Sequence, residues 1–547
     1  MEQAVSITAF YPELILAIAG CAALLLGPAQ RATVRNAIPG VALAGVIAAV
    51  ALVFFRYQEA DHTGAGFVFG GVAYYVRISG LVLGVLLVLS AWGQARDGEQ
   101  GEFVSMMVFS LLGLLLVAPA DNLILLFLAL EIVSIPTYIL VTISRFNVRA
   151  LEAGTKYFYL GALSAAIMAY GFTFLYGATG SITLSGAVYE MQNALSGARG
   201  PLAQNLGYIG LFLTMAGLFF KIAAVPLHFY IADVYQGSAN AVAGLLGFVP
   251  KLAGFVAIFK ILSLTTVWQG GSVPIYAILW VGAALSMTIG NVLALRQSNI
   301  KRMLAYSGIA HSGYMLVAVI AGPLSGTSGT MSSGMGAVLY YAVVYGIANL
   351  AAFLILGILR NRGRVCESVR DVAGLIRKEP VYALLLALAF LTLMGLPPTP
   401  GFWGKLSLFG SALSAAQASE GLSGWTYALV IIAVLNTAIG AAYYLRVVAA
   451  VLLYDEDEPA EADATAEWPS MGAYMCGVLL LIFSFYPNAL LMSGLAATRS
   501  AIQSETMQVS VLDERGSDET VVAGEVEEIN AAAADAAQFN MPTQSGD

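Results

Sequence analysis

Two proline-containing runs decide the fold of this 547-residue chain: KIAAVPLHFYIADVYQG at 221–237 and MGLPPTPGFWGKLSLFG at 394–410. They lie within apolar segments of 32 and 36 residues, at 204–235 and 380–415. One membrane crossing needs only about 20 helical residues, and an interior proline removes a backbone hydrogen bond and clashes with the preceding turn. We therefore predict two membrane helices that are each broken and unwound in the middle.

The composition excludes a soluble fold. Hydrophobic residues make up 59% of the chain and charged residues 11%, and the mean hydropathy is +0.80, whereas about a quarter of the residues in a soluble domain are charged. Cys21, Cys366 and Cys476 are far apart and form no CxxC pair, which excludes cysteine-ligated iron–sulfur, haem-attachment and zinc sites on this chain. The composition predicts a multi-span membrane protein without a cysteine-ligated redox centre.

The hydropathy pattern predicts an all-α integral membrane protein with about fourteen transmembrane helices, two of them broken. The predicted spans are 7–27, 36–55, 75–93, 103–119, 122–143, 153–177, 204–235, 239–264, 272–295, 302–322, 335–359, 380–415, 425–453 and 470–496.

Lysine and arginine are unevenly distributed between these spans, which predicts the orientation. Connections after odd-numbered spans hold fourteen of these residues, whereas those after even-numbered spans hold Arg56 and Arg199. The odd-numbered connections should therefore face the cytoplasm, and both termini should be non-cytoplasmic. Acidic residues gather at 454–469, which holds seven, and at 497–547, which holds ten. We interpret the first stretch as a cytoplasmic loop and the second as a disordered tail.

Seven charged residues fall inside the predicted spans. They are Glu131, Lys156, Lys221, Lys251, Lys260, Lys405 and Arg446. A charge at the centre of a membrane helix costs roughly 2.5 to 3.5 kcal/mol, so it rarely persists without a partner or a pathway. Lys260 and Arg446 lie nearer the ends of their spans, where long side chains can reach the headgroups. The other five residues indicate an interior function.

These central charges predict a proton path. One glutamate, Glu131, cannot neutralise four lysines, at positions 156, 221, 251 and 405. Burial disfavours a charged lysine and a nearby carboxylate favours it, so a lysine whose partner comes and goes can bind and release a proton. Lys221, Lys251 and Lys405 each lie near a proline, where freed carbonyls and water make ionisable groups easier to hydrate. The alternative is a static set of ion pairs that ties helices together.

Two histidines lie in the same charged region. His228 follows Pro226 by two residues, and His311 lies in the tenth predicted span. A lone histidine in an apolar span is often only a satisfied hydrogen-bonding residue, and the other interpretation is a proton relay. Both interpretations stay open for His228 and for His311.

The two broken helices are five spans apart, which predicts an internal repeat. An odd number of crossings in each copy inverts the second copy, and inverted repeats that meet at broken helices are typical of transporters. The predicted organisation is an N-terminal three-helix segment (1–102), two inverted five-helix repeats (103–264 and 272–453), an acidic cytoplasmic loop (454–469), a last transmembrane helix (470–496) and an acidic tail (497–547).

A third run, GNVLALRQSNIKRMLAYSGIAHSGYML at 290–316, completes a recognisable set with 221–237 and 394–410. Together the three runs closely resemble the subunit N family of bacterial proton-pumping NADH:quinone oxidoreductase, respiratory complex I. This family is antiporter-like, being related to subunits of multi-component sodium/proton antiporters. The resemblance implies a fourteen-helix fold with inverted five-helix repeats and a hydrophilic axis at mid-membrane.

The resemblance also assigns residues to that axis. It places the family's fifth-span glutamate on Glu131 and its later lysines and histidine on matching positions of this chain. These positions are Lys156, Lys221, His228, Lys251 and Lys405. Lysine rather than glutamate at 405 is what the resemblance implies for subunit N as opposed to subunit M.

The expected function is therefore that of a proton-translocating membrane-arm subunit, part of an NADH:quinone oxidoreductase in the bacterial inner membrane. The resemblance implies a hetero-oligomer with other membrane-arm subunits in the lipid bilayer and no nucleic-acid partner. It implies no cofactor on this chain, with FMN, iron–sulfur clusters and quinone bound by other subunits. One alternative is a subunit of a multi-component sodium/proton antiporter, and another is a structural scaffold.

Overall fold

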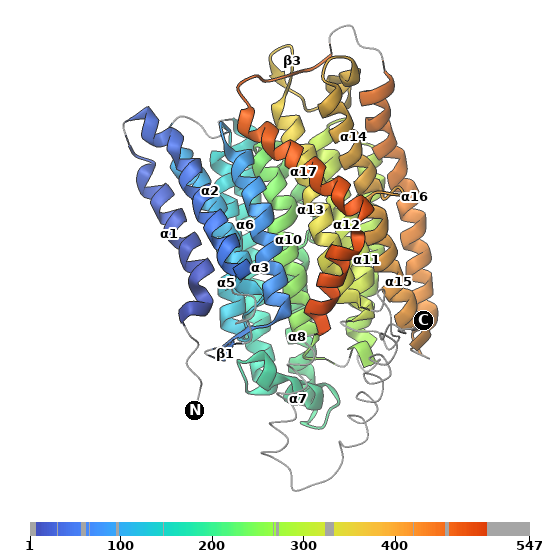
Figure 1. Cartoon of the computed structure of the whole chain (residues 1–547). Helices are drawn as coiled ribbons and strands as arrows, with labels where there is room; N and C mark the ends of the chain where they lie inside the picture. The colour runs from blue at the N-terminus through green and yellow to red at the C-terminus, as the bar shows by residue number, and fades with distance from the viewer. Residues whose placement is uncertain are drawn as a thin grey trace, which may run out of the picture.

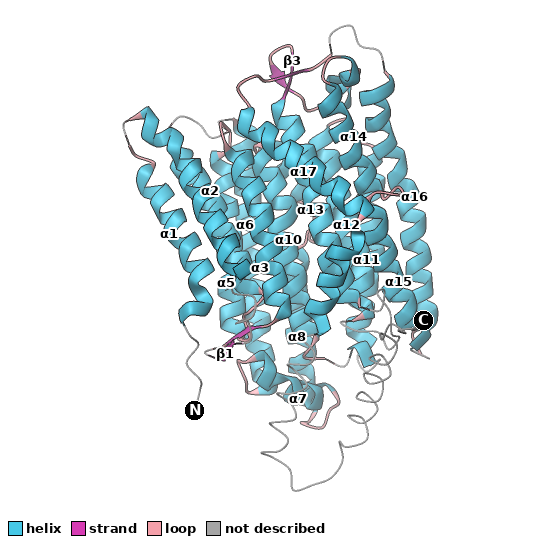
Figure 2. Ribbon diagram, viewed as in Figure 1, coloured by secondary structure: helices cyan, strands magenta, loops and turns pink. Residues whose placement is uncertain are grey.

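The computed structural model describes residues 7–29, 31–55, 62–64, 66–94, 98–145, 147–265, 267–269, 273–322, 333–418, 421–454 and 459–499. The described chain is a bundle of helices with a few short strands at its ends (Figures 1 and 2). The predicted fold class is confirmed. The tail from residue 500, predicted to be disordered, and positions 455–458 of the acidic loop lie outside the described residues.

The crossings agree with the predicted spans, except for the last one. They are α1 (Tyr11–Leu26), α2 (Ala32–Phe55), α3 (Gly71–Ala91), α4 (Gln100–Val117), α5 (Leu123–Ile143), α6 (Val148–Thr179), α8 (Pro201–Lys221) with α9 (Ile231–Gly237), α10 (Asn240–Leu262), α11 (Val273–Leu295), α12 (Ile300–Ala321), α13 (Gly334–Ile358), α14 (Pro380–Met394) with α15 (Pro400–Ala418), α16 (Ser423–Leu453) and α17 (Glu467–Phe485). Thirteen helices of the described chain are long and apolar enough to cross a membrane, and the α14–α15 pair is the fourteenth crossing.

Short elements lie at the two ends of the bundle. One end holds the strands β1 (His62–Gly64) and β2 (Phe67–Phe69) and the helix α7 (Leu184–Leu195), while β3 (Leu359–Asn361) lies at the opposite end (Figure 1). The amphipathic α7 was not predicted, because it is too short to appear as a span. Single 3-10 turns cover η1 (Ile7–Phe10), η3 (Val267–Gln269), η4 (Val369–Val372) and η5 (Leu375–Arg377).

Both predicted helix breaks are present, and the backbone groups that they free have partners. The carbonyl of Phe220 accepts a hydrogen bond from the Tyr230 hydroxyl at 2.8 Å, and that of Ile222 accepts one from Ser312 at 2.6 Å. In the second break, the Met394 carbonyl accepts a hydrogen bond from Lys405 Nζ at 2.8 Å. A broken helix can stay inside a membrane protein because other groups satisfy its freed backbone in this way.

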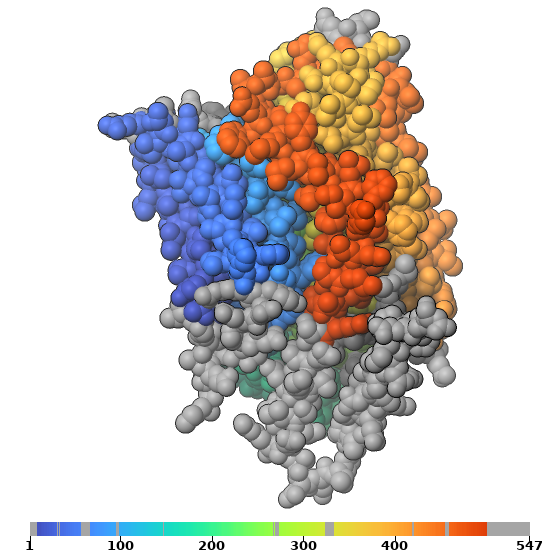
Figure 3. Space-filling view, in the orientation of Figure 1, coloured from blue at the N-terminus to red at the C-terminus, as the bar shows by residue number. Residues whose placement is uncertain are grey.

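The last span is also broken, which contradicts the single helix predicted over 470–496. α17 ends at Phe485, Tyr486 is not helical, and a second helix covers 487–499. Pro487 explains the interruption, since proline cannot donate to the preceding turn and is favoured at the start of a helix. Figure 3 shows α17 lying obliquely across the surface, and on one side it packs against α3.

Three helices form the centre of the bundle. The apolar windows of α10 and α13 are entirely buried and that of α12 is 94% buried, whereas α1, α2, α6 and α16 bury only 33% to 39% of theirs. Pro250 lies inside α10 without ending it. α10, α12 and α13 therefore supply positions that are screened from the surrounding lipid by the rest of the chain.

A small sheet at the β3 end attaches the acidic stretch to the basic connection. β3 pairs antiparallel with β4 (Arg364–Val365) and with β5 (Glu461–Ala462). Arg360 forms an ion pair with Asp463 at 3.2 Å, and Lys378 pairs with Glu461. The described part of the acidic stretch is thus bound by the basic residues of the 360–379 connection.

Candidate functional site

The first element of the site is a buried ion pair at the α8–α9 break. Lys221 is the last residue of α8, and its Nζ donates to Glu131 Oε1 on α5 at 2.7 Å and to Ser134 Oγ at 2.6 Å. The two charged side chains are only 3% and 15% exposed. The glutamate and the lysine that the sequence singled out at mid-span are therefore in direct contact.

Lys251 lies deeper, on α10, and has no carboxylate partner among the described ion pairs. It is 2% exposed. Its Nζ donates to the backbone carbonyl of Gly308 on α12 and lies 4.9 Å from the ring centroid of Tyr345 on α13. A main-chain dipole and an aromatic face thus stand in for a counter-ion around this lysine.

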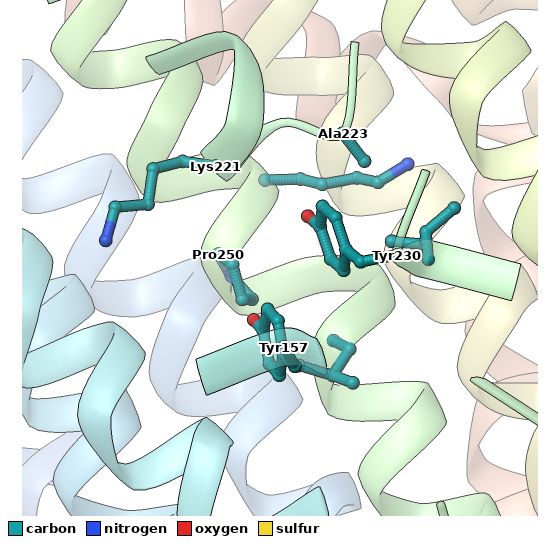
Figure 4. A pocket seen from close by; sticks show the side chains of 8 residues that line it. Tyr157, Lys221, Ala223, Tyr230 and Pro250 are labelled. Atoms are coloured by element: carbon teal, nitrogen blue, oxygen red, sulfur yellow. The ribbon is translucent and has the colours of Figure 1, made fainter. Parts of the chain in front are cut away.

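A small cavity separates Lys221 from Lys251. Its volume is about 10 Å³, roughly what one water molecule needs. Its lining consists of Tyr157, Lys221, Ala223, Tyr230, Ile231, Leu246, Pro250 and Lys251. Figure 4 shows the Lys221 side chain extending away from Tyr157 and Tyr230, in keeping with its hydrogen bond to Glu131. The stem of Lys221 lines the cavity while its ammonium group stays with the carboxylate.

His311, on α12, is held by two tyrosine hydroxyls. Its Nδ1 lies 2.6 Å from Tyr341 Oη on α13, and its Nε2 lies 2.8 Å from Tyr444 Oη on α16. Its ring centroid is 4.8 Å from that of Tyr345. Since Tyr345 also faces Lys251, this histidine adjoins the surroundings of the central lysine.

Lys405, on α15, lies on the opposite side of His311 from Lys251. It is 5% exposed, and its Nζ donates to the Met394 carbonyl and lies 5.0 Å from the Tyr314 ring centroid. Tyr314 in turn lies 5.7 Å from the His311 ring. The order across the bundle is therefore Lys251, Tyr345, His311, Tyr314 and Lys405. We call this sequence of groups, with the Glu131–Lys221 pair before it, the charged row.

Lys156 is not part of this row. Its Nζ pairs with Asp233 at 2.9 Å and with Glu152 at 2.7 Å, and its side chain is 43% exposed. Asp233 also binds Arg302 at 2.8 Å. The expectation of a buried lysine short of carboxylate partners was wrong for this position, because α6 is 32 residues long and places Lys156 in an early turn near those acids.

The remaining predicted positions, one histidine and two basic residues, lie outside the charged row. His228 lies in the link between α8 and α9, is 8% exposed, and packs its ring 4.8 Å from that of Phe229. Arg446 donates to the carbonyls of Leu295 and Gln297 at the end of α11, and Lys260 lies in the last turn of α10. The span-end positions predicted for Arg446 and Lys260 are confirmed.

Sequence reasoning missed the tyrosines that join the charged groups. Tyr341 and Tyr345 are four residues apart and therefore share one face of α13, with Asn349 one turn further. Polar positions at this spacing in an otherwise apolar span are the signal that could have revealed them. Lys301, counted as part of a connection, was also missed: it is fully buried, and its Nζ donates to the Ser238 carbonyl at 2.6 Å.

Residues 120–437 match the protein family described as NADH:quinone oxidoreductase/Mrp antiporter, transmembrane. The chain belongs to the NADH:quinone oxidoreductase/Mrp antiporter family. The matched range includes every member of the charged row, from Glu131 to Lys405. The predicted family resemblance is confirmed.

Similar proteins cover most of the chain. NADH-quinone oxidoreductase subunit N of Trichlorobacter lovleyi is 34% identical over 82% of this chain and 87% of its own length. A chain of respiratory complex I from Thermus thermophilus is 32% identical with a TM-score of 0.71, over 89% of this chain and 99% of that one. A chain of the Mrp complex from a Dietzia species shares the fold, with a TM-score of 0.74 at 20% identity, over 92% of this chain and 99% of its own.

Proposed function

We propose that this chain is the proton-translocating subunit N of an NADH:quinone oxidoreductase. Relatives that are 31% to 34% identical over most of the chain carry that name. The observation that carries the proposal is the charged row. Three lysines are buried in the bundle with one carboxylate among them. Tyrosine rings face Lys251 and Lys405, and the imidazole of His311 lies between those rings.

The charged row can move a proton because its positive charges interact in a poorly screened interior. While Glu131 holds Lys221, that ammonium charge is compensated and Lys251 can accept a proton. When the pair opens, Lys221 turns toward the small cavity, repels a second charge nearby, and favours proton transfer from Lys251 onward. His311 and its tyrosines receive that proton and pass it to Lys405, from which it leaves.

Two further positions are assigned to the ends of the path. We place Lys156, with Asp233 and Glu152, at the cytoplasmic mouth, where exposed groups can collect protons from solution. His228, beside the α8–α9 break, is the candidate relay between that mouth and Lys221. We keep the limits of the two five-helix repeats, 103–264 and 272–453, as a proposal that rests on the matching breaks.

The rest of the assembly supplies the redox chemistry. FMN, iron–sulfur clusters and quinone would be bound by other subunits, and their energy would reach this chain through contacts along the membrane arm. The basic residues around β3 support a cytoplasmic position for that end of the bundle, with both termini on the far side of the bacterial inner membrane. The complex is a hetero-oligomer in the bilayer.

Purification from the host membrane tests this assignment. The tagged chain, extracted in mild detergent, should copurify with subunits that carry flavin and iron–sulfur clusters, seen by their absorbance and by mass spectrometry. A detergent extract of the untagged strain is the control. Isolation with antiporter-type membrane subunits alone, without flavin or iron, would contradict the assignment and favour a sodium/proton antiporter.

A further inference from the structure

Uncharged polar groups connect α11, α12 and α16 beside the Lys405 end of the charged row. Their centre is Asn291 on α11, which is 1% exposed. Its Nδ2 donates hydrogen bonds to Tyr314 Oη on α12 at 3.0 Å and to the Asn436 carbonyl on α16 at 3.1 Å, and its Oδ1 accepts one from Tyr443 Oη at 3.0 Å. This buried amide therefore uses both its donor and its acceptor atom.

The sequence of α16 builds one side of this site. Asn436, Gly440 and Tyr443 are spaced by four and three residues and therefore share one face of the helix. The point where a Cβ on Gly440 would stand lies 3.2 Å from Asn291 Oδ1 and 3.7 Å from Tyr443 Oη. A side chain at 440 would press on the amide, and glycine leaves that space open.

Tyr314 links the amide to the charged row. Its ring centroid lies 5.0 Å from Lys405 Nζ and 5.7 Å from that of the His311 ring. Lys405 has no carboxylate partner among the described ion pairs, so the face of this ring and the Met394 carbonyl stabilise its ammonium group. The strength of such a contact depends on where the ring lies relative to the cation.

Asn291 binds the end of the Tyr314 side chain that lies furthest from its backbone. A tyrosine ring can turn about the bonds that join it to the backbone, and a hydrogen bond to its hydroxyl restricts that motion. Loss of the bond would leave a buried hydroxyl short of a partner, which is costly. The ring would then turn toward other polar groups and away from its place beside Lys405.

We propose that Asn291 is a positioning residue for the charged row. By holding the Tyr314 hydroxyl, it keeps the tyrosine ring against Lys405 and His311 in the arrangement that favours proton transfer to Lys405. Asn291 exchanges no proton. The proton that reaches Lys405 leaves His311 and its tyrosines and forms an N–H bond on the neutral amine, as in the proposed function, on which this inference rests.

A double-mutant cycle in the assembled complex tests the link between the amide and the ring. Asn291→Leu removes the amide at similar size, and Tyr314→Phe keeps the ring but removes the hydroxyl. Both delete the same hydrogen bond, so each should slow NADH-driven proton uptake by inverted vesicles on the order of fivefold, as expected for a weakened cation–π contact. The double variant should be no slower than either single variant, because residues that act through one contact are not additive. Additive losses, or normal uptake in Tyr314→Phe, would overturn the proposal.

The matched control removes a tyrosine hydroxyl between the same two helices. Tyr276 lies 15 residues before Asn291 on α11, is buried, and shares a hydrogen bond of 2.8 Å with Thr426 on α16. Tyr276→Phe should leave uptake per assembled complex, measured on native gels, unchanged. A loss equal to that of Tyr314→Phe would show that any hydroxyl between these helices matters, and would contradict a specific role for Asn291.

Gly440→Ala disturbs the amide without altering it. The added methyl group would stand 3.2 Å from Asn291 Oδ1, whereas nothing lies within 4 Å of the Cβ position of Gly424, in the first turn of the same helix. Gly440→Ala should slow uptake several-fold and Gly424→Ala should not. If Asn291→Leu fails to assemble, Gly440→Ala takes its place in the cycle with Tyr314→Phe, and the same lack of additivity is expected.

The dependence of the coupled reaction on quinone separates positioning from a general defect. Quinone is bound by other subunits in the proposed function, so Asn291→Leu should lower kcat and leave the KM for quinone unchanged. A changed KM would show a disturbance that spreads through the complex, which would overturn the proposal. Lys405→Leu in the same vesicles separates this inference from the proposed function. If Lys405→Leu abolishes uptake while Asn291→Leu does not, only the positioning role is wrong; if both pump normally, the function assigned to Lys405 is wrong as well.

Discussion

Lys221, Lys251 and Lys405 are equally buried but differ in their partners. Lys221 has a carboxylate at 2.7 Å, whereas Lys251 and Lys405 have a backbone carbonyl and the face of a tyrosine ring. A static scaffold would be expected to neutralise each buried charge, because an uncompensated one is costly. One carboxylate for three lysines is instead what a path needs if charge is to move between its members.

Substitutions at Glu131 can separate the effect of its charge from the effect of its size. Glu131→Gln keeps the size and some hydrogen bonding but removes the carboxylate that compensates Lys221. Proton uptake and coupled quinone reduction should fall on the order of tenfold, as a rise of about 1.4 kcal/mol in the transfer barrier would produce. Glu131→Asp should retain part of both activities. The assay is NADH-driven uptake by inverted vesicles, normalised to assembled complex.

The matched control makes the same chemical change at the surface. Glu190→Gln removes a carboxylate that pairs with Arg199 at 2.7 Å in a site that is 39% exposed, where ion pairs contribute little. It should leave uptake unchanged. Full pumping by assembled Glu131→Gln would refute the compensating role of this residue.

Among single residues, the sequence reveals charges better than their partners. Glu131, Lys221, Lys251 and Lys405 could be found because a charge in an apolar span is rare. The tyrosines are harder to find: the four-residue spacing of Tyr341 and Tyr345 places both on one face of α13, but tyrosine is common in membrane helices and its hydroxyl matters only once the neighbouring helix is known. Lys156 was misjudged in two ways: its partner Asp233 lies 77 residues away, and its partner Glu152, four residues earlier on the same helix, was overlooked.

At the scale of elements, span length and proline together predicted the breaks. The breaks at Pro226 and at Pro397–Pro400 lie in spans longer than one crossing needs, so the excess residues had to unwind. Pro250 lies in a span of ordinary length, and α10 continues through it. The break before Pro487 also lies in a span of ordinary length, which is why the pattern did not predict it.

The second break can be tested through the glycine that ends α14. Gly395 has φ +81° and lies 2.9 Å from Lys405 Cδ, measured from the point where a Cβ would stand. Gly395→Ala should therefore displace the Lys405 stem and reduce proton uptake several-fold. It should also destabilise the folded chain by roughly 1 to 2 kcal/mol, which is the cost of a left-handed alanine. Uptake and thermal stability of the assembled complex are the measurements.

Gly180 provides the control, because it ends α6 with φ +74° and nothing lies within 4 Å of its Cβ position. Gly180→Ala carries the same backbone strain without touching the charged row. It should lower the thermal stability to a similar degree and leave uptake per complex intact. Equal uptake in the two variants would show that the Gly395 contact does not position Lys405.

At the scale of the whole molecule, the sequence predicted the number of crossings but not which helices are central. α10, α12 and α13 are apolar all round, and so are peripheral helices in a bilayer, because lipid and protein interior are equally apolar. Hydropathy therefore does not indicate which helices lie at the centre of the bundle. The buried polar residues are the remaining guide, and Lys251, His311 and Tyr345 do lie on these three helices.

The proposed orientation of the molecule rests on its basic residues and can be tested by labelling. In a background without Cys21, Cys366 and Cys476, Ala198→Cys lies on an exposed connection before α8 and Arg364→Cys on exposed β4 at the other end. A membrane-impermeant maleimide added to intact spheroplasts should label position 198 at once and position 364 only after permeabilisation. The reverse pattern would overturn the orientation.

The central claim is that Lys251 releases and rebinds a proton and is not a fixed positive charge. Lys251→Arg tests it most directly, because guanidinium keeps the charge but stays protonated in proteins. Lys260→Arg, near the end of the same helix, is the matched control. Proton uptake by inverted vesicles, driven by NADH and normalised to assembled complex, should be largely lost in Lys251→Arg and retained in Lys260→Arg. Near-normal uptake with arginine at 251 would contradict the account.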